Sequence, residues 1–356
     1  MTTNLCLSLL VVLQLLYFPA PSKGQNRDDE IVKIRSRVVF IDTLVKDKKT
    51  GASVTDLERE NFEVRDDGKS RTLSYFSRAG EGRRRPLALV LVMEMGARDA
   101  NDYMRRAEVL ESIDAALKRL PPEDEVAVMA NLGGAGTPLR TLTNFTHDRK
   151  KIAEALAAVR TLPMPQPTWY REELENILGM VERAAAERPD SQIVVVPVTV
   201  VLMPISFADR DKIAARLIRA NAFFSPLIRD AGNASIKMSH LPGKYPAPPR
   251  PIFDAIGRLA GWDNYAPQHI AQQTGGEATS VHQRDDFGVA LEKLIADLAA
   301  RYNLGFTLNE NERDDGRMHK LEVKMKARDS SGKERKLLVR ARRGYYIKMQ
   351  EVPLAK

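Results

Sequence analysis

The sequence predicts an α/β protein in which a doubly wound, mostly parallel sheet is inserted into a small β-sandwich. Residues 86–302 alternate long apolar runs with amphipathic helical patterns, which is typical of parallel strands covered by helices on both faces. The flanks, residues 25–85 and 303–356, instead show short alternating strands and turn signals. Each flank is too small to bury both faces of a sheet, so we expect one sandwich built from both. This arrangement brings the two ends of the inserted domain together, as domain insertion requires.

Composition and charge limit the class of protein. The chain has 356 residues, of which 43% are hydrophobic, and this suits two globular domains rather than a collagen-like or broadly disordered chain. The formal net charge of +8 is too mild to predict a nucleic-acid partner, and no aromatic residues are interleaved with the basic clusters. We therefore expect no nucleic acid among the partners.

The first 24 residues are expected to form a signal peptide. Residues 5–18 are almost all apolar and uncharged, and about 14 residues are fewer than the ~20 that span a membrane. Small residues favour cleavage before Gln25, which predicts a secreted or periplasmic protein. Because Lys and Arg are missing ahead of the apolar run, an uncleaved membrane anchor is the alternative, and only then is a membrane a partner. Cys6 is the one cysteine, so the mature chain would have no disulfide and no thiol nucleophile.

The first flank, residues 25–85, is predicted to be β-structure. Apolar residues 38–41 predict a strand, and residues 62–64 alternate between apolar and polar side chains. The Asp-Asp-Gly sequence at residues 66–68 is typical of a hairpin turn, and residues 71–76 predict the strand that follows.

The middle segment predicts the central sheet and its helices. Buried strands are expected where apolar residues are continuous, and helices where apolar residues recur three and four positions apart. The Pro-rich segment at residues 230–267 interrupts the pattern and is expected to be an irregular surface excursion. The expected strands are residues 87–93, 126–129, 193–203 and 222–228, and the expected helices contain residues 107–117, 152–159, 174–181, 213–217 and 286–298.

The second flank returns to β-structure. Turn signals at residues 314–316 and 329–332 separate alternating runs. The expected strands are residues 302–308, 320–327, 336–341 and 344–347.

Five short motifs lie in order along the chain. The longest, at residues 45–69, contains a V-x-D strand, the turn G-A-S-V-T-D-L and the run N-F-E-V-R-D-D-G-K, and the other four are residues 142–148, 271–276, 302–306 and 343–345. Together they resemble the von Willebrand factor A-related family that recurs in Acidobacteria. Asn61 departs from the family, which usually has Asp before the Phe. The resemblance covers nearly all of the chain after the expected signal peptide, and it implies a doubly wound A-type domain.

Related A domains usually bind a divalent metal at the C-terminal edge of the sheet and use it to hold a partner's carboxylate. The resemblance implies Asp-x-Ser-x-Ser after the first strand, a Thr before a later helix and an Asp after the fourth strand. This chain has Glu94, Gly96 and Arg98 at the first motif, and Thr168 fits the Thr position. Residues 196–203, in the last long strand, contain no Asp.

These departures predict a degenerate adhesion site that holds no metal. Mg²⁺ needs hard oxygen ligands in near-octahedral geometry, and Gly96 has no oxygen in its side chain. Arg98 brings a positive charge to the place of the ion. Two unit charges ~4 Å apart already repel by about 4 kcal/mol at an effective dielectric constant of ~20. We therefore expect no Mg²⁺ at this site, and no metal or other cofactor in the chain.

Two interpretations of Glu94 and Arg98 stay open. The simpler one is a local ion pair at the end of the strand, with no part in binding. The alternative is that Arg98 substitutes for the metal and holds a partner's carboxylate directly by paired hydrogen bonds.

The sequence contains no recognisable catalytic constellation. None of the five histidines is paired at metal-ligand spacing, and neither a nucleophile elbow nor a phosphate-binding loop is present. The expected function is therefore an exported, non-enzymatic module that binds a protein or a cell-surface polymer. Binding is expected at the C-terminal edge of the sheet, near Glu94, Gly133 and Thr168. The alternatives are an exported hydrolase with an unrecognised carboxylate site and a structural envelope component.

Overall fold

The structure is a computed structural model, and it describes most of the chain after the expected signal peptide. Residues 1–24 lie outside the described residues. The described ranges are residues 37–78, 80–81, 85–95, 102–132, 139–163, 171–199, 205–229, 250–259, 261–263, 265–282 and 286–347.

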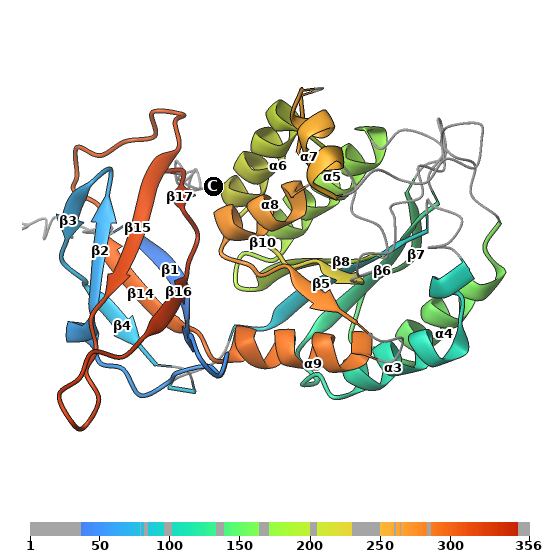
Figure 1. The fold of residues 1–356 in the computed structure, drawn as a ribbon, viewed down its shortest axis with the longest axis horizontal. Helices are drawn as coiled ribbons and strands as arrows, with labels where there is room; N and C mark the ends of the chain where they lie inside the picture. The colour runs from blue at the N-terminus through green and yellow to red at the C-terminus, as the bar shows by residue number, and fades with distance from the viewer. Residues whose placement is uncertain are drawn as a thin grey trace, which may run out of the picture. The chain divides into compact units, whose positions relative to one another are not determined.

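The central sheet has the strand order β7-β6-β5-β8-β11-β13 (Figure 1). Numbered by their succession along the chain, these strands run 3-2-1-4-5-6, which is the doubly wound arrangement. Neighbouring strands are parallel except for β7, which is antiparallel to β6. The bounds are β5 Leu87–Glu94, β6 Glu125–Asn131, β7 Arg140–Thr146, β8 Gln192–Thr199, β11 Leu227–Arg229 and β13 Thr279–Val281, with β10 Phe223–Phe224 also paired to β8.

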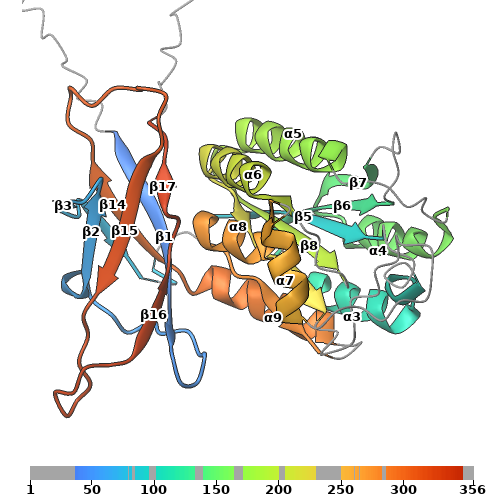
Figure 2. The same cartoon turned by 45° about the horizontal axis from the view of Figure 1, so that its top comes forward.

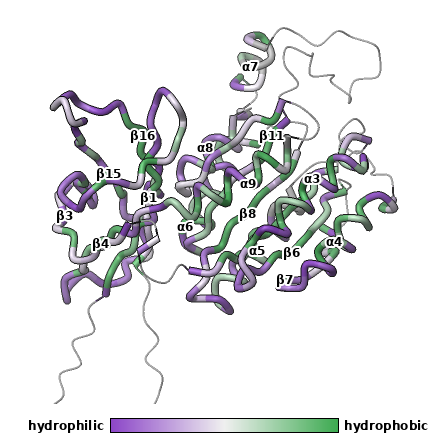
Figure 3. Tube along the Cα trace, turned by 90° about the horizontal axis from the view of Figure 1, so that it is seen from below, coloured by the Kyte–Doolittle hydropathy of each residue, from purple (hydrophilic) through white to green (hydrophobic). Residues whose placement is uncertain are grey.

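Both faces of this sheet are buried, which explains why its middle strands are apolar throughout. Leu89 and Leu91 of β5 point into a core shared with α3, α4 and α9, whereas Val90 and Val92 point into a core shared with α5, α6 and α8. The two groups of helices lie on opposite sides of the sheet (Figure 2), and the tube along β6 and β8 is strongly hydrophobic (Figure 3). The helices are α3 Ala107–Lys118, α4 Arg149–Ala158, α5 Arg171–Glu187, α6 Phe207–Arg219, α8 Ala266–Thr274 and α9 Asp286–Ala299.

The two flanks build one β-sandwich, because strands from the N-terminal flank pair with strands from the C-terminal flank. Ile41 lies opposite Leu304, and Val64 lies opposite Val323. One sheet has the order β16-β1-β14-β4 and the other β17-β15-β2-β3, and a single apolar core fills the space between them. The bounds are β1 Val38–Asp47, β2 Phe62–Asp66, β3 Lys69–Arg71, β4 Tyr75–Ser77, β14 Tyr302–Thr307, β15 His319–Met325, β16 Leu337–Arg340 and β17 Gly344–Tyr345. The predicted fold class is confirmed.

Several local elements differ from the prediction. The expected strand at residues 71–76 is two strands, because β3 pairs with β2 while β4 crosses to β14 in the other sheet. The expected strand at residues 222–228 is likewise divided into β10 and β11. Strand β7 was not expected, because its exposed and half-buried residues show no clear alternation.

The Pro-rich segment at residues 230–267 is not irregular throughout. Its C-terminal part contains α7 Arg250–Leu259 and β12 Trp262–Asp263, which pairs with β9 Ile205–Ser206. Pro251 is the second residue of α7, where a missing backbone N–H costs nothing because the first turn of a helix has no acceptor for it. The density of prolines alone therefore wrongly predicted irregular structure for the part of the chain that forms α7 and β12.

The described residues contain no helix that is long and apolar enough to cross a membrane.

A buried lysine joins the sandwich to the helical layer. Lys46 of β1 lies 2.5 Å from a carboxylate oxygen of Glu277 and 2.6 Å from one of Asp297 in α9.

Candidate functional site

The carboxyl ends of β5 and β8 form the point where the strand order of the sheet reverses. Open α/β sheets place ligands at this edge, because the helices that follow the two strands diverge to opposite faces. Glu94 ends β5, Thr199 ends β8, and Asn131 ends β6 on the other side of β5. The topology therefore brings three polar side chains to one edge of an otherwise apolar sheet.

These three residues form one row across the sheet. Glu94 is in register with Asn131, and Met93 is in register with Val198, so Thr199 follows at the level of Glu94. The same alternation that turns Val92 toward α5, α6 and α8 turns Glu94 toward that face. The row is buried: the exposed fractions are 7% for Glu94, 1% for Asn131 and 8% for Thr199.

Asn131 satisfies the buried carboxylate of Glu94. Its Nδ2 donates a hydrogen bond to Glu94 Oε2 over 2.8 Å. A carboxylate this far from water requires such a donor, because burying an unpaired charge is costly. The Asn131 amide is thus one partner of Glu94 at this edge.

Positively charged side chains lie on the other face of the same edge. The guanidinium of Arg229, at the end of β11, is 4.1 Å from the ring centroid of Tyr103, and that of Arg106 is 5.4 Å from it. Tyr103 is 2% exposed and packs against Phe287 of α9, so it is a fixed support for both cations. Arg106 is the N-cap residue of α3, the helix that follows β5.

Of the predicted site residues, the structure describes only Glu94, and it lies at the expected strand end. Gly96, Arg98 and Thr168 lie outside the described residues, as does Gly133, so the expected pairing of Glu94 with Arg98 stays a prediction. The structure adds Asn131 and Thr199, which sequence reasoning missed. The sequence could have indicated both, because each is a polar residue at the end of an apolar strand.

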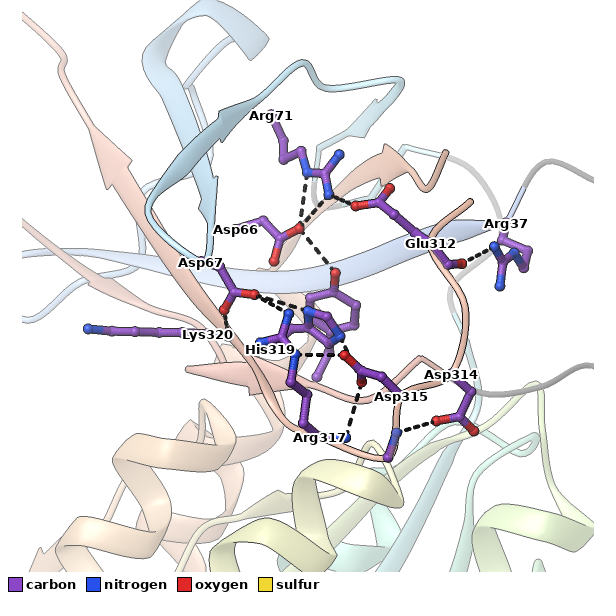
Figure 4. A network of polar contacts seen from close by, with 12 residues as sticks. Arg37, Asp66, Asp67, Arg71, Glu312, Asp314, Asp315, Arg317, His319 and Lys320 are labelled. Atoms are coloured by element: carbon purple, nitrogen blue, oxygen red, sulfur yellow. Dashed lines mark hydrogen bonds and ion pairs between the residues drawn. The ribbon is translucent and has the colours of Figure 1, made fainter. Parts of the chain in front are cut away.

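A second group of titratable side chains lies in the sandwich, around the turn between β2 and β3 (Figure 4). His319 Nδ1 is 3.1 Å from Asp67 Oδ2, although 252 positions separate the two residues. They border a pocket of about 410 Å³ that is lined almost entirely by charged side chains. Sequence reasoning treated Asp66 and Asp67 as turn residues and His319 as unpaired, and nothing in the spacing could have joined them.

Hydrogen bonds control the charge of this pocket. Burial raises the pKa of Asp67, but hydrogen bonds from the Lys320 backbone, Arg317 and His319 outweigh that effect and lower it. Burial also raises the pKa of Glu312, and its bond with Arg71 and the backbone N–H of Asn309 again reverse the balance. The carboxylates of Asp67 and Glu312 are therefore favoured in their charged form.

Comparison with known proteins reveals no close relative. No protein-family model and no curated protein matches the chain. Among solved structures, the von Willebrand factor type A protein from Catenulispora acidiphila is 11% identical, with a TM-score of 0.40, and the match covers 79% of this chain and 72% of that one. The SpRpn10 VWA domain is 13% identical, with a TM-score of 0.35, and the match covers 59% of this chain and 94% of that domain.

A third similar structure is proximal thread matrix protein 1 from the mussel byssus. It is 11% identical, with a TM-score of 0.39, and the match covers 60% of this chain. This chain spans only 48% of the length of that protein. The strand order and the helices on both faces of the sheet show a doubly wound α/β fold joined to a β-sandwich.

Proposed function

We propose that this chain is an exported, non-enzymatic interaction module of the von Willebrand factor A-related family found in Acidobacteria. It is secreted or periplasmic, and it binds a protein or a cell-surface polymer at the C-terminal edge of its central sheet, without a metal ion. The observation that carries the proposal is the buried row of Asn131, Glu94 and Thr199 at the point where the strand order reverses.

The geometry of this row argues against Mg²⁺. The ion requires oxygen ligands at about 2.0–2.1 Å in a nearly octahedral arrangement, usually with several waters. Glu94 Oε2 already accepts a hydrogen from the Asn131 amide, and the carboxylate is only 7% exposed. One carboxylate oxygen is therefore already engaged by the Asn131 amide, and little of the side chain is open to an ion with its waters.

The charges near the row favour an acidic group on the partner. Arg229 and Arg106 are both held against Tyr103, so their guanidinium groups are partly ordered before a partner arrives. A guanidinium recognises a carboxylate with two parallel hydrogen bonds, which supplies direction as well as charge. Arg98, together with Gly96 and Thr168, is expected to extend this surface.

Partner capture from an envelope extract tests the proposal. The full chain is immobilised in EDTA, the captured protein or polymer is purified, and its affinity is measured with and without Mg²⁺. We expect binding that does not need metal and that weakens at least about tenfold in Arg229→Ala and in Arg98→Ala, the cost of a lost charge-assisted bond.

Arg119→Ala is the matched control. Arg119 is the C-cap of α3, so it lies at the opposite end of that helix from Arg106, and its exposed ion pair with Glu292 adds little stability. The proposal is contradicted if binding requires Mg²⁺. It is also contradicted if the Arg229→Ala and Arg98→Ala variants bind the partner as tightly as the Arg119→Ala variant does. Melting temperatures of all variants separate lost binding from lost folding.

A further inference from the structure

The β-sandwich brings together three side chains of a kind that binds metal ions. Asp66 and Asp67 lie at the turn that ends β2, and His319 is the first residue of β15, the strand that pairs with β2. One donor atom from each residue lies within 4.8 Å of the donor atoms of the other two. Among the described residues, this is the cluster of acidic and histidine side chains that meets that criterion.

The separation of two of these donors already suits a shared ion. His319 Nδ1 and Asp67 Oδ2 are 3.1 Å apart. Two ligands at about 2.1 Å from a zinc ion, at a tetrahedral angle, are about 3.4 Å apart. An ion could therefore replace the proton between them with only a small movement of either side chain.

The third residue supplies an independent sign of a missing partner. Asp66 is 4% exposed, and its Oδ1 is buried without a hydrogen-bond partner among the described residues. In Figure 4 this oxygen, which carries no dashed line, points toward Asp67. A buried carboxylate oxygen directed at a second carboxylate is unfavourable unless a cation lies between them.

Each of the three side chains is also oriented by its other polar atom. Asp66 Oδ2 accepts hydrogen bonds from Arg71, at 2.7 Å, and from the hydroxyl of Tyr345, at 3.2 Å. Asp67 Oδ1 accepts a hydrogen bond of 2.8 Å from the backbone N–H of Lys320.

The outer nitrogen of the histidine also faces a carboxylate. His319 Nε2 lies 3.3 Å from Asp315 Oδ1, although the pair lacks hydrogen-bond geometry, and the ring stacks on Tyr345. Histidine ligands typically donate their second N–H to a carboxylate, which fixes the ring and leaves the first nitrogen for the ion, and Asp315 lies close enough to take that part after a small rotation.

We propose that Asp66, Asp67 and His319 bind a divalent transition-metal ion, at a site in the sandwich that is separate from the sheet edge. One imidazole nitrogen and two carboxylate oxygens form a ligand set that Zn²⁺ accepts, with an open position for water. The hard ions Mg²⁺ and Ca²⁺ prefer oxygen ligands alone. The pocket of about 410 Å³ gives the ion access from solvent.

One cation must move when the ion binds. The guanidinium of Arg317 lies 2.9 Å from Asp67 Oδ2, on the side where the metal would bind. Its side chain is 55% exposed, and its Nε also bonds Asp315 Oδ2 over 2.6 Å, so only the contact with Asp67 has to break. Arg71 is held instead by Asp66 Oδ2 and by Glu312, so it stays in place and orients its ligand.

Zinc binding by the full chain tests this site. The protein is stripped with EDTA, dialysed, and titrated with Zn²⁺ in competition with a chromophoric chelator. We expect roughly one bound ion per chain, and more than about a hundredfold weaker binding in Asp67→Asn and in His319→Gln. Asp67 has a φ of 47°, a conformation that Asn tolerates well, so that variant keeps its fold.

Three further variants distinguish a metal site from a merely structural network. Arg317→Ala strengthens Zn²⁺ binding because it removes the competing cation, whereas Asp315→Asn weakens it about tenfold because it removes the support of the histidine ring. Asp314→Asn, on the same loop, leaves it unchanged, because that carboxylate only bonds the backbone of Gly316.

Three results would overturn the site: no Zn²⁺ bound by the wild-type chain, binding that survives Asp67→Asn, or binding that is lost in Glu94→Gln. The last result would place the ion at the sheet edge, and would then contradict the proposed function as well. If Zn²⁺ binding is lost in Asp67→Asn and normal in Glu94→Gln, the ion lies in the sandwich and the result does not bear on the proposed function.

Discussion

Asn131 Nδ2 lies 2.8 Å from Glu94 Oε2, so the carboxyl ends of two neighbouring strands share one buried hydrogen bond. The pair stands where the resemblance to A-type domains implied the start of a metal motif. A carboxylate with an internal donor is stable in the interior without an ion. Because of this hydrogen bond, we expect the sheet edge to bind its partner through the charged side chains of Arg229 and Arg106 rather than through a metal ion.

Removing the donor is expected to destabilise the sheet. Asn131→Ala deprives a buried carboxylate oxygen of its amide partner, which costs about 1–3 kcal/mol of unfolding free energy. Urea unfolding measures the loss. The double variant Glu94→Leu with Asn131→Leu should cost clearly less than the sum of the two single changes, because it removes both polar groups together. Additive losses would show that the two side chains do not depend on each other.

The motif at residues 271–276 has a structural explanation. Gly275 ends α8 with a φ of 81°, and a Cβ on Gly276 would lie 2.1 Å from the carbonyl oxygen of Phe224. We expect Gly276→Ala to lower the unfolding free energy by about 3 kcal/mol or more, because backbone must move to make room.

Gly316→Ala is the control for that change. Gly316 has a positive φ of 71°, which Gly276 does not, and a Cβ on Gly316 would meet no described atom within 4 Å. It should cost only about 1–2 kcal/mol, the price of the left-handed conformation alone. Equal losses in the two variants, measured by chemical denaturation, would contradict the close approach of Gly276 to Phe224.

The elements that sequence patterns predicted well are those where one local rule dominates. Strands β5 and β8 are buried on both faces, so their apolar runs are continuous. A helix was expected to contain residues 152–159, and it begins as α4 after Asp148, whose carboxylate accepts hydrogen bonds from the N–H groups of Lys150 and Lys151. The missed strand β7 lies at the sheet edge and is held by pairing with β6 rather than by burial.

The candidate sites show the limit of the same reasoning. The end of an apolar strand can be recognised from the sequence, so Glu94 was expected where β5 ends, and Asn131 could have been found in the same way. The part of Glu94 in binding stays a prediction. The meeting of Asp67 with His319 depends on the antiparallel pairing of β2 with β15, which closes a loop of 252 positions around the whole inserted domain. No local pattern carries that information.

Stability is expected to fall below about pH 6.5 because of His269 in α8. Burial and the positive charge of Arg210 lower the pKa of this histidine from its usual 6.5, against a smaller opposing effect of Asp211. In the unfolded chain the imidazole takes up a proton as the pH falls through 6.5, whereas the folded chain resists until a lower pH. The contribution is therefore complete above that range and is lost as the pH falls through the lowered folded pKa.

Unfolding free energies at pH 5 to 8 measure this effect, and His269→Gln should flatten that part of the profile. Arg210→Gln should return the imidazole pKa toward its usual value, as seen in an NMR titration of the ring protons. A His269→Gln profile as steep as that of the wild type would assign the pH dependence to other groups.

Calorimetry with Mg²⁺ and Ca²⁺ is expected to show no binding at the sheet edge. Glu94 is buried and bonded to Asn131, and Arg229 and Arg106 place positive charge on the other face of the same edge. We expect no heat of binding with Mg²⁺ and a heat of binding with Zn²⁺ that disappears in Asp67→Asn. This combination agrees with a metal-free sheet edge and a separate ion in the sandwich. Mg²⁺ binding that is lost in Glu94→Ala or Thr168→Ala would restore a metal-dependent adhesion site, because those are the oxygen ligands that the resemblance retains.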